Sequence, residues 1–489
     1  MTAEIEQISR TGESGFVLQL KDAPSIHGLQ TVRHMPGRRV VCRGQWNDQE
    51  VYAKIFIGSQ ATRYAQRDLQ GVRALEAAGI LTPPLLHTGP GIDGMSEVLI
   101  FAAIADSTNA EQAWTELSAD SPARFVMAQK LVTEVAHHHN AGLMQTDLYL
   151  RNFLLQGERI YTLDGDAVRE LSGWSVRRKA LQNLALLLSK FDVVDEAIWL
   201  SELLAIYARE RGWSNPPASG CMLRRIAAIR RRVAAGYADR KVFRECTDIM
   251  VSQSNCKYQA IARPYVSAQL QQALAKPDLL VDGARSRRLK SGNTCTVALT
   301  EIDGRKVVIK RYNIKSFWHG LNRALRQSRA AISWSNAHRL HMYGIATARP
   351  IALLEKRCGP VRRQAYFLAE YVEAPDAAAF FADADLDQAQ KATAAANVAR
   401  LFYKLYLLGI EHGDFKAANV KMVDYQPLLI DLDSMREHSC RWLFERRHVR
   451  DLRRFMRNWQ RDNETGILLV NAFKKTYKGH RLLERAGWL

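Results

Sequence analysis

The sequence predicts an α+β fold made of two copies of one unit, each with a small strand-rich part followed by a larger helical part. Three observations predict it. Strand patterns precede long helical patterns in each half of the 489-residue chain. A lysine on an expected strand is followed, 93 residues later in one half and 104 in the other, by an Asp–Asn–Asp series. The spacing within that series is the same in both halves, which indicates an internal duplication.

The second half carries the clearer series. Asp414 stands in H-G-D, Asn419 follows it by five residues, and Asp431 follows it by seventeen, directly behind an apolar run. Phosphoryl transfer needs a carboxylate that orients the attacking hydroxyl, and oxygen ligands that hold Mg²⁺ against the nucleotide phosphates. The pattern is close to the catalytic loop and metal site of kinases. Asp414 is therefore the candidate catalytic residue, and Asn419 and Asp431 are candidate metal ligands.

The first half repeats this spacing with three residues. Asp147 is the second candidate catalytic residue, and Asn152 and Asp164 are the second pair of candidate metal ligands.

Each half also places a lysine where it can reach the phosphates of ATP. Lys54 stands in V-Y-A-K-I-F and Lys310 in V-V-I-K, both on expected strands. We therefore expect two tandem protein-kinase-like domains that use ATP and Mg²⁺, each with a small β-rich N-lobe and a larger helical C-lobe. The expected domains are residues 1–255, with degenerate motifs and a weaker or regulatory role, and residues 256–489, with better preserved motifs.

The remaining elements follow from periodicity and from turn residues. The expected strands lie in 38–60, 97–101, 294–302, 305–311 and 366–371. The expected helices are 63–78, 121–140, 319–343 and 385–408.

Several residues near these motifs have two open interpretations. Gly292, in S-G-N-T (291–294), is a candidate for a turn that covers the phosphates, and R-G-Q (43–45) is a weaker one. Glu370 either begins a hinge that offers backbone groups to adenine or simply ends a strand. Asp166 and Asp433 are either extra metal contacts or loop caps.

Composition restricts the partners. Lys and Arg exceed Asp and Glu by 19, which favours an anionic partner such as nucleic acid, a membrane surface or a phosphorylated substrate. Arginines interleave with apolar residues in 223–233 and in 446–459, a pattern typical of basic amphipathic helices. No apolar run approaches the roughly 18 residues that span a bilayer, and the N-terminus has no signal pattern. Seven scattered cysteines indicate a reducing compartment and argue against a zinc site or disulfides.

The run His137-His138-His139 invites a metal interpretation. Adjacent residues on a helix point about 100° apart, so the three rings cannot converge on one ion. We expect structural roles for them.

These residues resemble a known family, the lipopolysaccharide core heptose kinases and Kdo kinases, a branch of the protein-kinase-like fold. In the second half the similarity lies in S-R-A-A-I-S-W-S-N-A-H-R-L-H-M-Y-G-I-A-T-A-R-P-I (328–351), H-G-D-F-K-A-A-N-V (412–420) and L-I-D-L-D (429–433). In the first half T-D-L-Y-L-R-N-F-L-L (146–155) is similar to the catalytic loop of the family.

The resemblance implies ATP-dependent phosphorylation of an inner-core heptose or Kdo at the cytoplasmic face of a Gram-negative inner membrane. The acceptor would be an anionic, lipid-linked sugar of the lipopolysaccharide core, and the chain would contact the anionic membrane surface as a peripheral protein. That fits a cationic chain without a membrane span. No nucleic-acid partner is expected, and the sequence leaves the oligomeric state open.

The first half departs from the family pattern. Gln145 stands where the catalytic-loop His would be, and L-D-G-D (163–166) is an unusual metal motif. Asn183 stands where the second half has Asp451. These differences favour the second domain as the stronger catalyst.

Neither half plainly shows the Lys–Glu pair of protein kinases. Counting back from the glycine that ends each helix reaches Asp68 in the first half and Ser333 in the second, so Lys310 needs a different partner.

Two other functions remain open. The chain is compatible with a kinase of another acceptor, either a protein or a small molecule, although a net charge of +19 suits a cationic acceptor poorly. It is also compatible with a pair of pseudokinases that scaffold core-assembly enzymes.

Overall fold

The structure is a computed structural model, and it describes residues 2–118, 121–284, 286–292, 295–312, 327–359, 361–460, 463–478 and 481–488. Contacts divide the chain into two compact units, the first with residues 1–191 and 195–229, the second with residues 192–194 and 230–489. This division comes before the expected boundary at 255/256. The reason is that β12 (Ile249–Gln253) pairs with β13 (Lys257–Ala262), which pairs in turn with a strand of the second unit's sheet.

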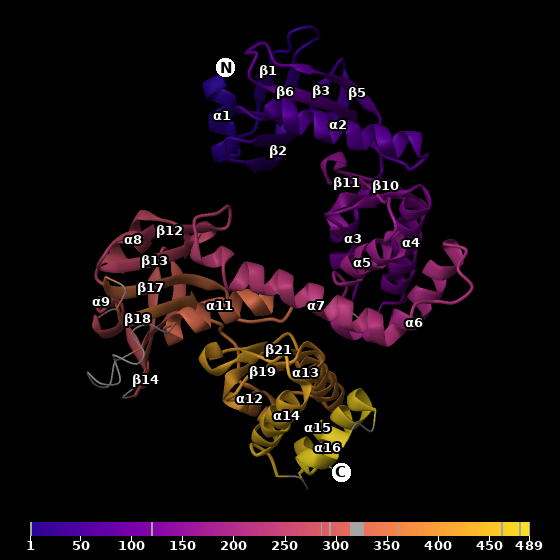
Figure 1. Cartoon of the computed structure of the whole chain (residues 1–489). Coiled ribbons are helices and arrows are strands. Elements are labelled where there is room, and N and C mark those ends of the chain that lie inside the picture. Colours follow the sequence, from indigo (N-terminus) through magenta and orange to yellow (C-terminus); the bar gives the residue numbers. More distant parts are fainter. Residues whose placement is uncertain are drawn as a thin grey trace. The chain divides into compact units, whose positions relative to one another are not determined.

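The strand-rich lobe of the first unit is a six-stranded antiparallel sheet with a helix on each face (Figure 1). The order across the sheet is β1-β2-β3-β4-β6-β5. Its strands are β1 (Phe16–Leu18), β2 (Ile26–Met35), β3 (Arg39–Trp46), β4 (Gln49–Phe56), β5 (Leu85–Pro90) and β6 (Glu97–Ala102).

Alternation of side chains along β4 produces the two faces. Val51, Ala53 and Ile55 are buried in the cluster that α1 (Thr2–Thr11) covers. Lys54 alternates with them and therefore lies on the other face, where α2 (Ala61–Ala77) packs. The strand thus delivers one lysine to the inner side of the lobe.

The helical lobe of the first unit contains small hairpins as well as helices. Its helices are α3 (Ala110–Glu116), α4 (Pro122–Asn140), α5 (Val176–Leu188) and α6 (Val193–Glu210), and α7 (Ser219–Ala238) crosses the boundary between the units. Its strands are β7 (Thr108–Asn109), β8 (Leu143–Gln145), β9 (Phe153–Gln156), β10 (Arg159–Thr162) and β11 (Val168–Glu170). Two 3-10 turns, Leu150–Asn152 and Gly165–Ala167, follow the candidate catalytic and metal-binding aspartates.

The strand-rich lobe of the second unit is a seven-stranded antiparallel sheet, in the order β12-β13-β17-β18-β16-β15-β14. The further strands are β14 (Arg287–Ser291), β15 (Cys295–Ile302), β16 (Arg305–Tyr312), β17 (Pro350–Cys358) and β18 (Val361–Glu370). Helices α8 (Ala268–Ala275) and α9 (Leu279–Asp282) cover the face that Val307 and Ile309 line. Helix α11 (Arg329–Met342) packs on the other face, to which Lys310 alternates.

The helical lobe of the second unit follows the sheet in sequence (Figure 1). Its helices are α12 (Ala377–Ala382), α13 (Gln388–Leu408), α14 (Arg441–Met456), α15 (Glu464–Tyr477) and α16 (Arg481–Ala486). Its strands are β19 (Ile410–Glu411), β20 (Val420–Val423), β21 (Gln426–Leu429) and β22 (Arg436–Glu437). A capping box of Asp387 and Gln390 begins α13, and Gly409, with φ +74°, ends it immediately before the catalytic loop.

The α+β class is confirmed, and so are the main expected elements. Strands β3, β4, β6, β15, β16 and β18 and helices α2, α4 and α13 coincide with the expected segments to within a few residues, whereas α11 begins only at Arg329, with Ser328 as its N-cap residue. Residues 319–326 of the expected helix and Thr294 of the expected strand lie outside the described residues. All seven cysteines are free, as their scatter predicts.

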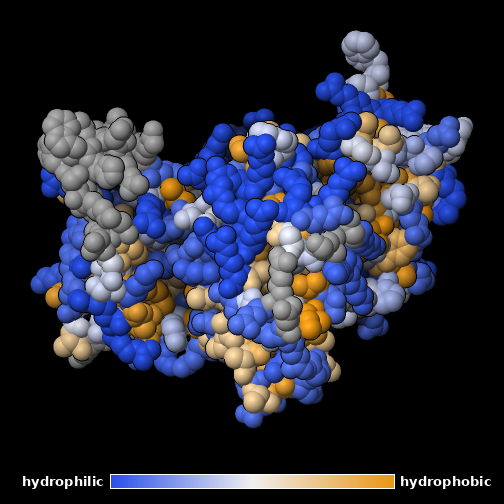
Figure 2. Space-filling model, turned by 90° about the horizontal axis from the view of Figure 1, so that it is seen from below, coloured by the Kyte–Doolittle hydropathy of each residue, from blue (hydrophilic) through white to orange (hydrophobic). Residues whose placement is uncertain are grey.

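The surface is mostly polar. Hydrophilic residues cover most of the face seen in Figure 2, and hydrophobic groups on it are scattered. Within the described residues, no helix combines the length and apolarity that a bilayer crossing requires.

The contact of α2 with the turn after Asp164 allows no extra atom. A Cβ added to Gly71 would lie 1.9 Å from the carbonyl oxygen of Gly165. We expect Gly71→Ala to push α2 off this turn and to destabilise the first unit by roughly 1–3 kcal/mol, measured as faster hydrogen exchange of the α2 amides. The control is Gly236→Ala on α7, where a Cβ meets nothing within 4 Å. That variant is expected to gain about 0.5–1 kcal/mol, and equal effects of the two substitutions would contradict this account.

Candidate functional site

The second unit brings Asp414, the candidate catalytic residue, and Asn419, a candidate metal ligand, together in one loop. The loop runs from β19 through a 3-10 turn at Ala417–Asn419. The Asn419 amide nitrogen donates to the backbone oxygen of Asp414 at 2.9 Å and to its carboxylate at 3.1 Å. Because both bonds use the nitrogen, the side-chain oxygen of Asn419 is the atom left for a cation.

Asp431 completes this site from the end of β21. Its backbone is left-handed, with φ +64°, and its carboxylate accepts a hydrogen bond from Lys310 Nζ at 2.8 Å. Burial would raise the pKa of Asp431, but the ammonium of Lys310 more than offsets burial, and the pKa lies below its ordinary value. Lys310 on β16 therefore pairs with the candidate metal ligand itself. Ser333 of α11, the position counted back from Gly344, bonds instead to Tyr312 at 3.0 Å.

Two buried residues hold the catalytic loop in shape. Asp451 on α14 accepts hydrogen bonds from the backbone amides of His412 at 2.8 Å and Gly413 at 3.2 Å. The imidazole Nε2 of His412 lies 3.1 Å from the backbone oxygen of Ile430, next to Asp431. Burial lowers the pKa of His412, so the ring is neutral and donates from Nε2 to that carbonyl.

Sequence reasoning missed two cations that flank Asp414. Lys416 Nζ lies 3.2 Å from its carboxylate, and Arg454 Nη1 lies 3.3 Å from it. Arg454 also donates to the backbone oxygen of Gly413. Lys416 stands two residues after Asp414, and Arg454 stands one helical turn after Asp451. These positions in the sequence could have indicated that both cations lie near the loop.

Asp433, an open candidate for a metal contact, pairs with Arg329 at 2.6 Å. Arg329 is the first residue of α11, so this ion pair ties the helix to the loop after Asp431. Asn336 adds two hydrogen bonds from α11 to the same loop, to the backbone oxygens of Leu432 and Met435. The carboxylate of Asp433 therefore has a structural partner, Arg329.

The first unit repeats the arrangement. Asn152 Nδ2 donates to the backbone oxygen of Asp147 at 2.7 Å, and Asp164 has φ +67°. Lys54 Nζ lies 3.5 Å from the carboxylate of Asp164 and 2.8 Å from that of Asp68 on α2. Asp68, the residue reached by counting back from Gly79, thus pairs with Lys54 in place of the glutamate of protein kinases.

Substitutions in the first unit keep the loop contacts. Gln145, at the position of His412, donates to the backbone oxygen of Leu163 at 2.6 Å. Asn183, at the position of Asp451, donates to the backbone oxygen of Gln145 at 2.7 Å. Burial raises the pKa of Asp147, and the nearby carboxylate of Asp164 raises it further. Asp166, like Asp433, pairs with an arginine, Arg67.

The histidine run has structural partners, as predicted. His138 Nε2 lies 3.0 Å from the hydroxyl of Thr162, whereas His139 contacts Tyr207 and Asn183. Among the described residues, no group of three or more His, Cys, Asp or Glu side chains could hold a metal ion. The mixed Asp and Asn oxygens of Asp431 and Asn419 still suit Mg²⁺, a hard cation that keeps much of its own water.

Of the two segments predicted to form a turn over the phosphates, one lies between two strands and the other lies within a strand. Gly292 lies between β14 and β15, but Asn293 and Thr294 of its motif lie outside the described residues. The weaker candidate at 43–45 is wrong, because these residues lie within β3 and a Cβ on Gly44 would clash with the backbone of His27. In the strand-rich lobe of the first unit, the turn between β2 and β3 is at 36–38.

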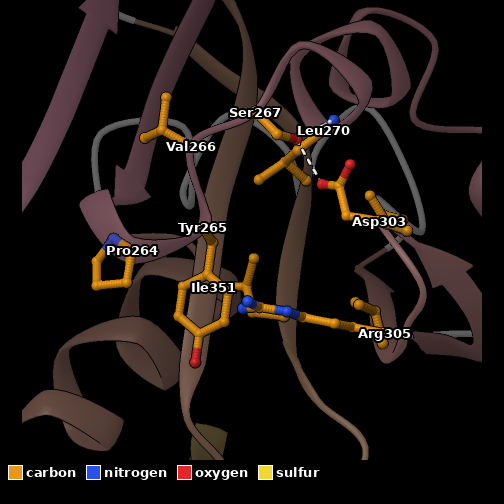
Figure 3. Close-up of a pocket in the computed structure, with 10 residues that line it drawn as sticks. Pro264, Tyr265, Val266, Ser267, Leu270, Asp303, Arg305 and Ile351 are labelled. Carbon is orange, nitrogen blue, oxygen red and sulfur yellow. Dashed lines mark hydrogen bonds between the residues drawn. The ribbon is translucent and has the colours of Figure 1, made fainter.

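Glu370 ends β18. Its amide donates to the backbone oxygen of Arg349 at 3.0 Å, and its carboxylate accepts from Tyr265 at 2.7 Å. Tyr265 lines a pocket of about 150 Å³ between the start of α8 and the β15–β16 hairpin, where Ser267 bonds to Asp303 (Figure 3). Val307 also lines it and alternates with Lys310, so the pocket lies on the face of the sheet away from Asp414.

The comparisons with known proteins concern mainly the second unit. The sequence model of the lipopolysaccharide kinase (Kdo/WaaP) family matches residues 281–477. The matched segment is less than half of the chain. The match spans Lys310, Asp414, Asn419 and Asp431, and the chain is a kinase, a phosphotransferase. No curated protein matches the chain.

Two solved structures are similar to the chain. One is WaaP in complex with acyl carrier protein, with 18% identity and a TM-score of 0.32, covering 48% of this chain and 92% of that one. The other is vaccinia related kinase 3, with 11% identity and a TM-score of 0.29, covering 55% of this chain and 86% of that one. The Kdo/WaaP kinase family implies ATP as phosphate donor and a divalent cation.

Asp451 predicts a pH dependence of stability. Burial raises its pKa to about 6, although the amides of His412 and Gly413 oppose the rise. Between pH 4 and 6 the folded state therefore holds a proton that the unfolded state has lost, and the free energy of unfolding falls as pH rises, by up to roughly 3 kcal/mol. Denaturant unfolding at several pH values measures this.

The matched variant is Asp451→Asn. Its side-chain oxygen can keep both amide bonds, and its nitrogen replaces Oδ1, a buried atom without a hydrogen-bond partner. We expect the pH dependence between 4 and 6 to shrink in this variant and to persist in Asp424→Asn, on an exposed turn. An unchanged dependence in Asp451→Asn would contradict the assignment.

Proposed function

We propose that the chain phosphorylates an inner-core sugar of lipopolysaccharide, a heptose or Kdo, with ATP as donor, at the cytoplasmic face of the inner membrane. One observation carries the proposal. Within the segment that matches the Kdo/WaaP kinase family, Lys310 contacts Asp431 and Asn419 contacts Asp414. The amide of Ile430, next to Asp431, donates to the backbone oxygen of Asn419 at 3.0 Å, which supports one site for the phosphate-binding and acceptor-binding groups.

Each residue of the site in the second unit has a proposed role in phosphoryl transfer. Lys310 binds the α and β phosphates, and Gly292 and Glu370 are the candidates for covering the phosphates and for approaching adenine. Asn419 and Asp431 supply the oxygens for Mg²⁺, which when bound neutralises charge on the phosphates. Asp414 orients the acceptor hydroxyl and takes its proton. Asp451 and His412 keep these groups in position through the backbone of the loop.

The cations beside Asp414 support an anionic acceptor. Lys416 and Arg454 both reach its carboxylate, and Arg454 is about one-third exposed, at 35%. An acceptor hydroxyl that approaches Asp414 must pass these two charges, which favours a phosphorylated or carboxylated sugar. The net charge of +19 and the basic helix α14 favour peripheral contact with an anionic membrane surface.

The first unit is proposed as a second kinase-like domain. Lys54, Asp147, Asn152 and Asp164 repeat the contacts of the second unit, and Gln145 reproduces the loop contact of His412. Its catalytic role is proposed to be weaker, because Tyr149 and Leu186 stand at the positions of Lys416 and Arg454, although Arg151 and Lys190 act electrostatically on Asp147.

Asp414→Asn tests the proposal directly. The amide cannot accept the hydroxyl proton, so ATP consumption with purified core oligosaccharide is expected to fall by about 10²- to 10⁴-fold. Asp147→Asn is the matched control and is expected to retain most activity. Full activity of Asp414→Asn, or no phosphate transfer to any core oligosaccharide by the wild type, would refute the proposed reaction.

Arg454→Gln tests the nature of the acceptor. Loss of one charged hydrogen-bonding group is expected to raise the KM for an anionic core acceptor by about tenfold, with the KM for ATP unchanged. Arg446→Gln is the control, because Arg446 on the same helix stacks on Trp442 instead. Equal effects on both KM values would assign Arg454 to the nucleotide side of the site.

A further inference from the structure

The first unit differs from the second in the charges that face Asp164, the aspartate that the sequence spacing assigns to metal binding. Arg39 Nη1 lies 3.7 Å and Lys54 Nζ 3.5 Å from the same carboxylate oxygen of Asp164. The side chains of Arg39 and Asp164 are only 11% and 16% exposed. In the second unit Asp431 is 31% exposed, and Lys310 is the cation that lies within 4 Å of it among the described residues.

We infer that the charged cluster around Asp164 in the first unit binds a di- or triphosphate group through arginines, without a divalent cation. The inference relies on the proposed kinase-like character of this unit only for the location of this cluster.

Positive charge is crowded at Asp164. A divalent cation held by this carboxylate would lie beside two cations that are almost excluded from water, where repulsion is poorly screened. Asn152 and Asp164 therefore do not suit Mg²⁺ as Asn419 and Asp431 do. The Asp164 oxygen between Arg39 and Lys54 is buried and has no hydrogen-bond partner, and Lys54 donates instead to both carboxylate oxygens of Asp68.

A further arginine, Arg33 on β2, interacts electrostatically with Asp164 and Asp147, and burial together with the neighbours Arg39 and Arg151 lowers its pKa. Arg151 and Lys190 act on Asp147 from the helical lobe. Positive charge thus exceeds negative charge at this site: the cations that interact electrostatically with Asp68, Asp147 or Asp164 are Arg33, Arg39, Lys54, Arg151 and Lys190, and Arg67, which also interacts with Asp68, is paired with Asp166. A phosphate chain supplies the missing negative charge, and guanidinium groups match its oxygens in pairs.

The β2–β3 hairpin is held in place. Arg33 and Arg39 flank the turn between β2 and β3. The turn is anchored to α1, since His34 Nδ1 lies 2.9 Å from the backbone oxygen of Ser9 and the Gly37 amide donates to the Ser9 hydroxyl at 2.9 Å. The guanidinium of Arg39 also lies 5.9 Å from the centroid of the Phe56 ring. The arginines are therefore positioned before any ligand arrives.

The test measures binding to the full chain by calorimetry, in a Lys310→Ala background that weakens nucleotide binding at the second site. The probes are ATP and inorganic tripolyphosphate, each with Mg²⁺ and with EDTA. We expect binding in EDTA at least as tight as in Mg²⁺, and a loss of about tenfold or more in Arg39→Ala. Arg43→Ala is the control: Arg43 lies on the same strand, is half exposed and pairs with Glu50.

The outcomes separate the ligand sources. Tripolyphosphate that binds as tightly as ATP supports a site for the phosphate chain alone, and tighter binding of ATP supports a nucleotide site. Binding that requires Mg²⁺, absence of binding by both probes, or equal effects of Arg39→Ala and Arg43→Ala would overturn the inference. Thermal unfolding shows whether the Arg39→Ala chain is folded. Arg39→Lys keeps the charge and shows whether binding needs the guanidinium group or only a positive charge. Failure here leaves the Asp414 reaction unaffected, since that is measured separately on the second unit.

Discussion

The ion pair between Lys310 and Asp431 is the contact on which the second site depends. It joins the middle of a sheet to a loop in the helical lobe, 121 residues later in sequence. The lysine is supplied by the period-two alternation of β16, and the aspartate by a left-handed backbone at the end of β21. Because each partner is fixed by its own element, the pair sets the distance between the phosphate-binding strand and the catalytic loop.

The loops around this pair reach the same contacts with different chemistry in the two units. A neutral His412 and a Gln145 each donate to the backbone one residue before the metal-binding aspartate. Helix α11 reaches its loop with the amide of Asn336, whereas α2 at the equivalent position has Gly71, which lets the backbone of Gly165 approach directly. Position and hydrogen-bonding capacity, rather than residue type, are what these sites share.

Charge is where the two units diverge. In the second unit the cations Lys416 and Arg454 lie beside Asp414, the residue proposed to orient the acceptor hydroxyl. In the first unit Arg33 and Arg39 gather at the aspartate that the spacing assigns to metal. The net charge of +19 therefore includes two separate clusters of positive charge. The cluster at Asp414 suits an anionic acceptor, and the cluster at Asp164 suits a phosphate chain.

The sequence by itself determined the class of the fold and the catalytic series, because strand alternation, helical period and the Asp–Asn–Asp spacing are all local in the chain. It also predicted that Asp68 stands opposite Lys54 and that Asn183 corresponds to Asp451, since both follow from counting along helices. Only the tertiary structure decided that Lys310 pairs with Asp431, that Asp433 and Asp166 are committed to arginines, and that the first hairpin turns at 36–38. Each of these depends on which side chains of distant segments meet, and no periodicity within one segment contains that information.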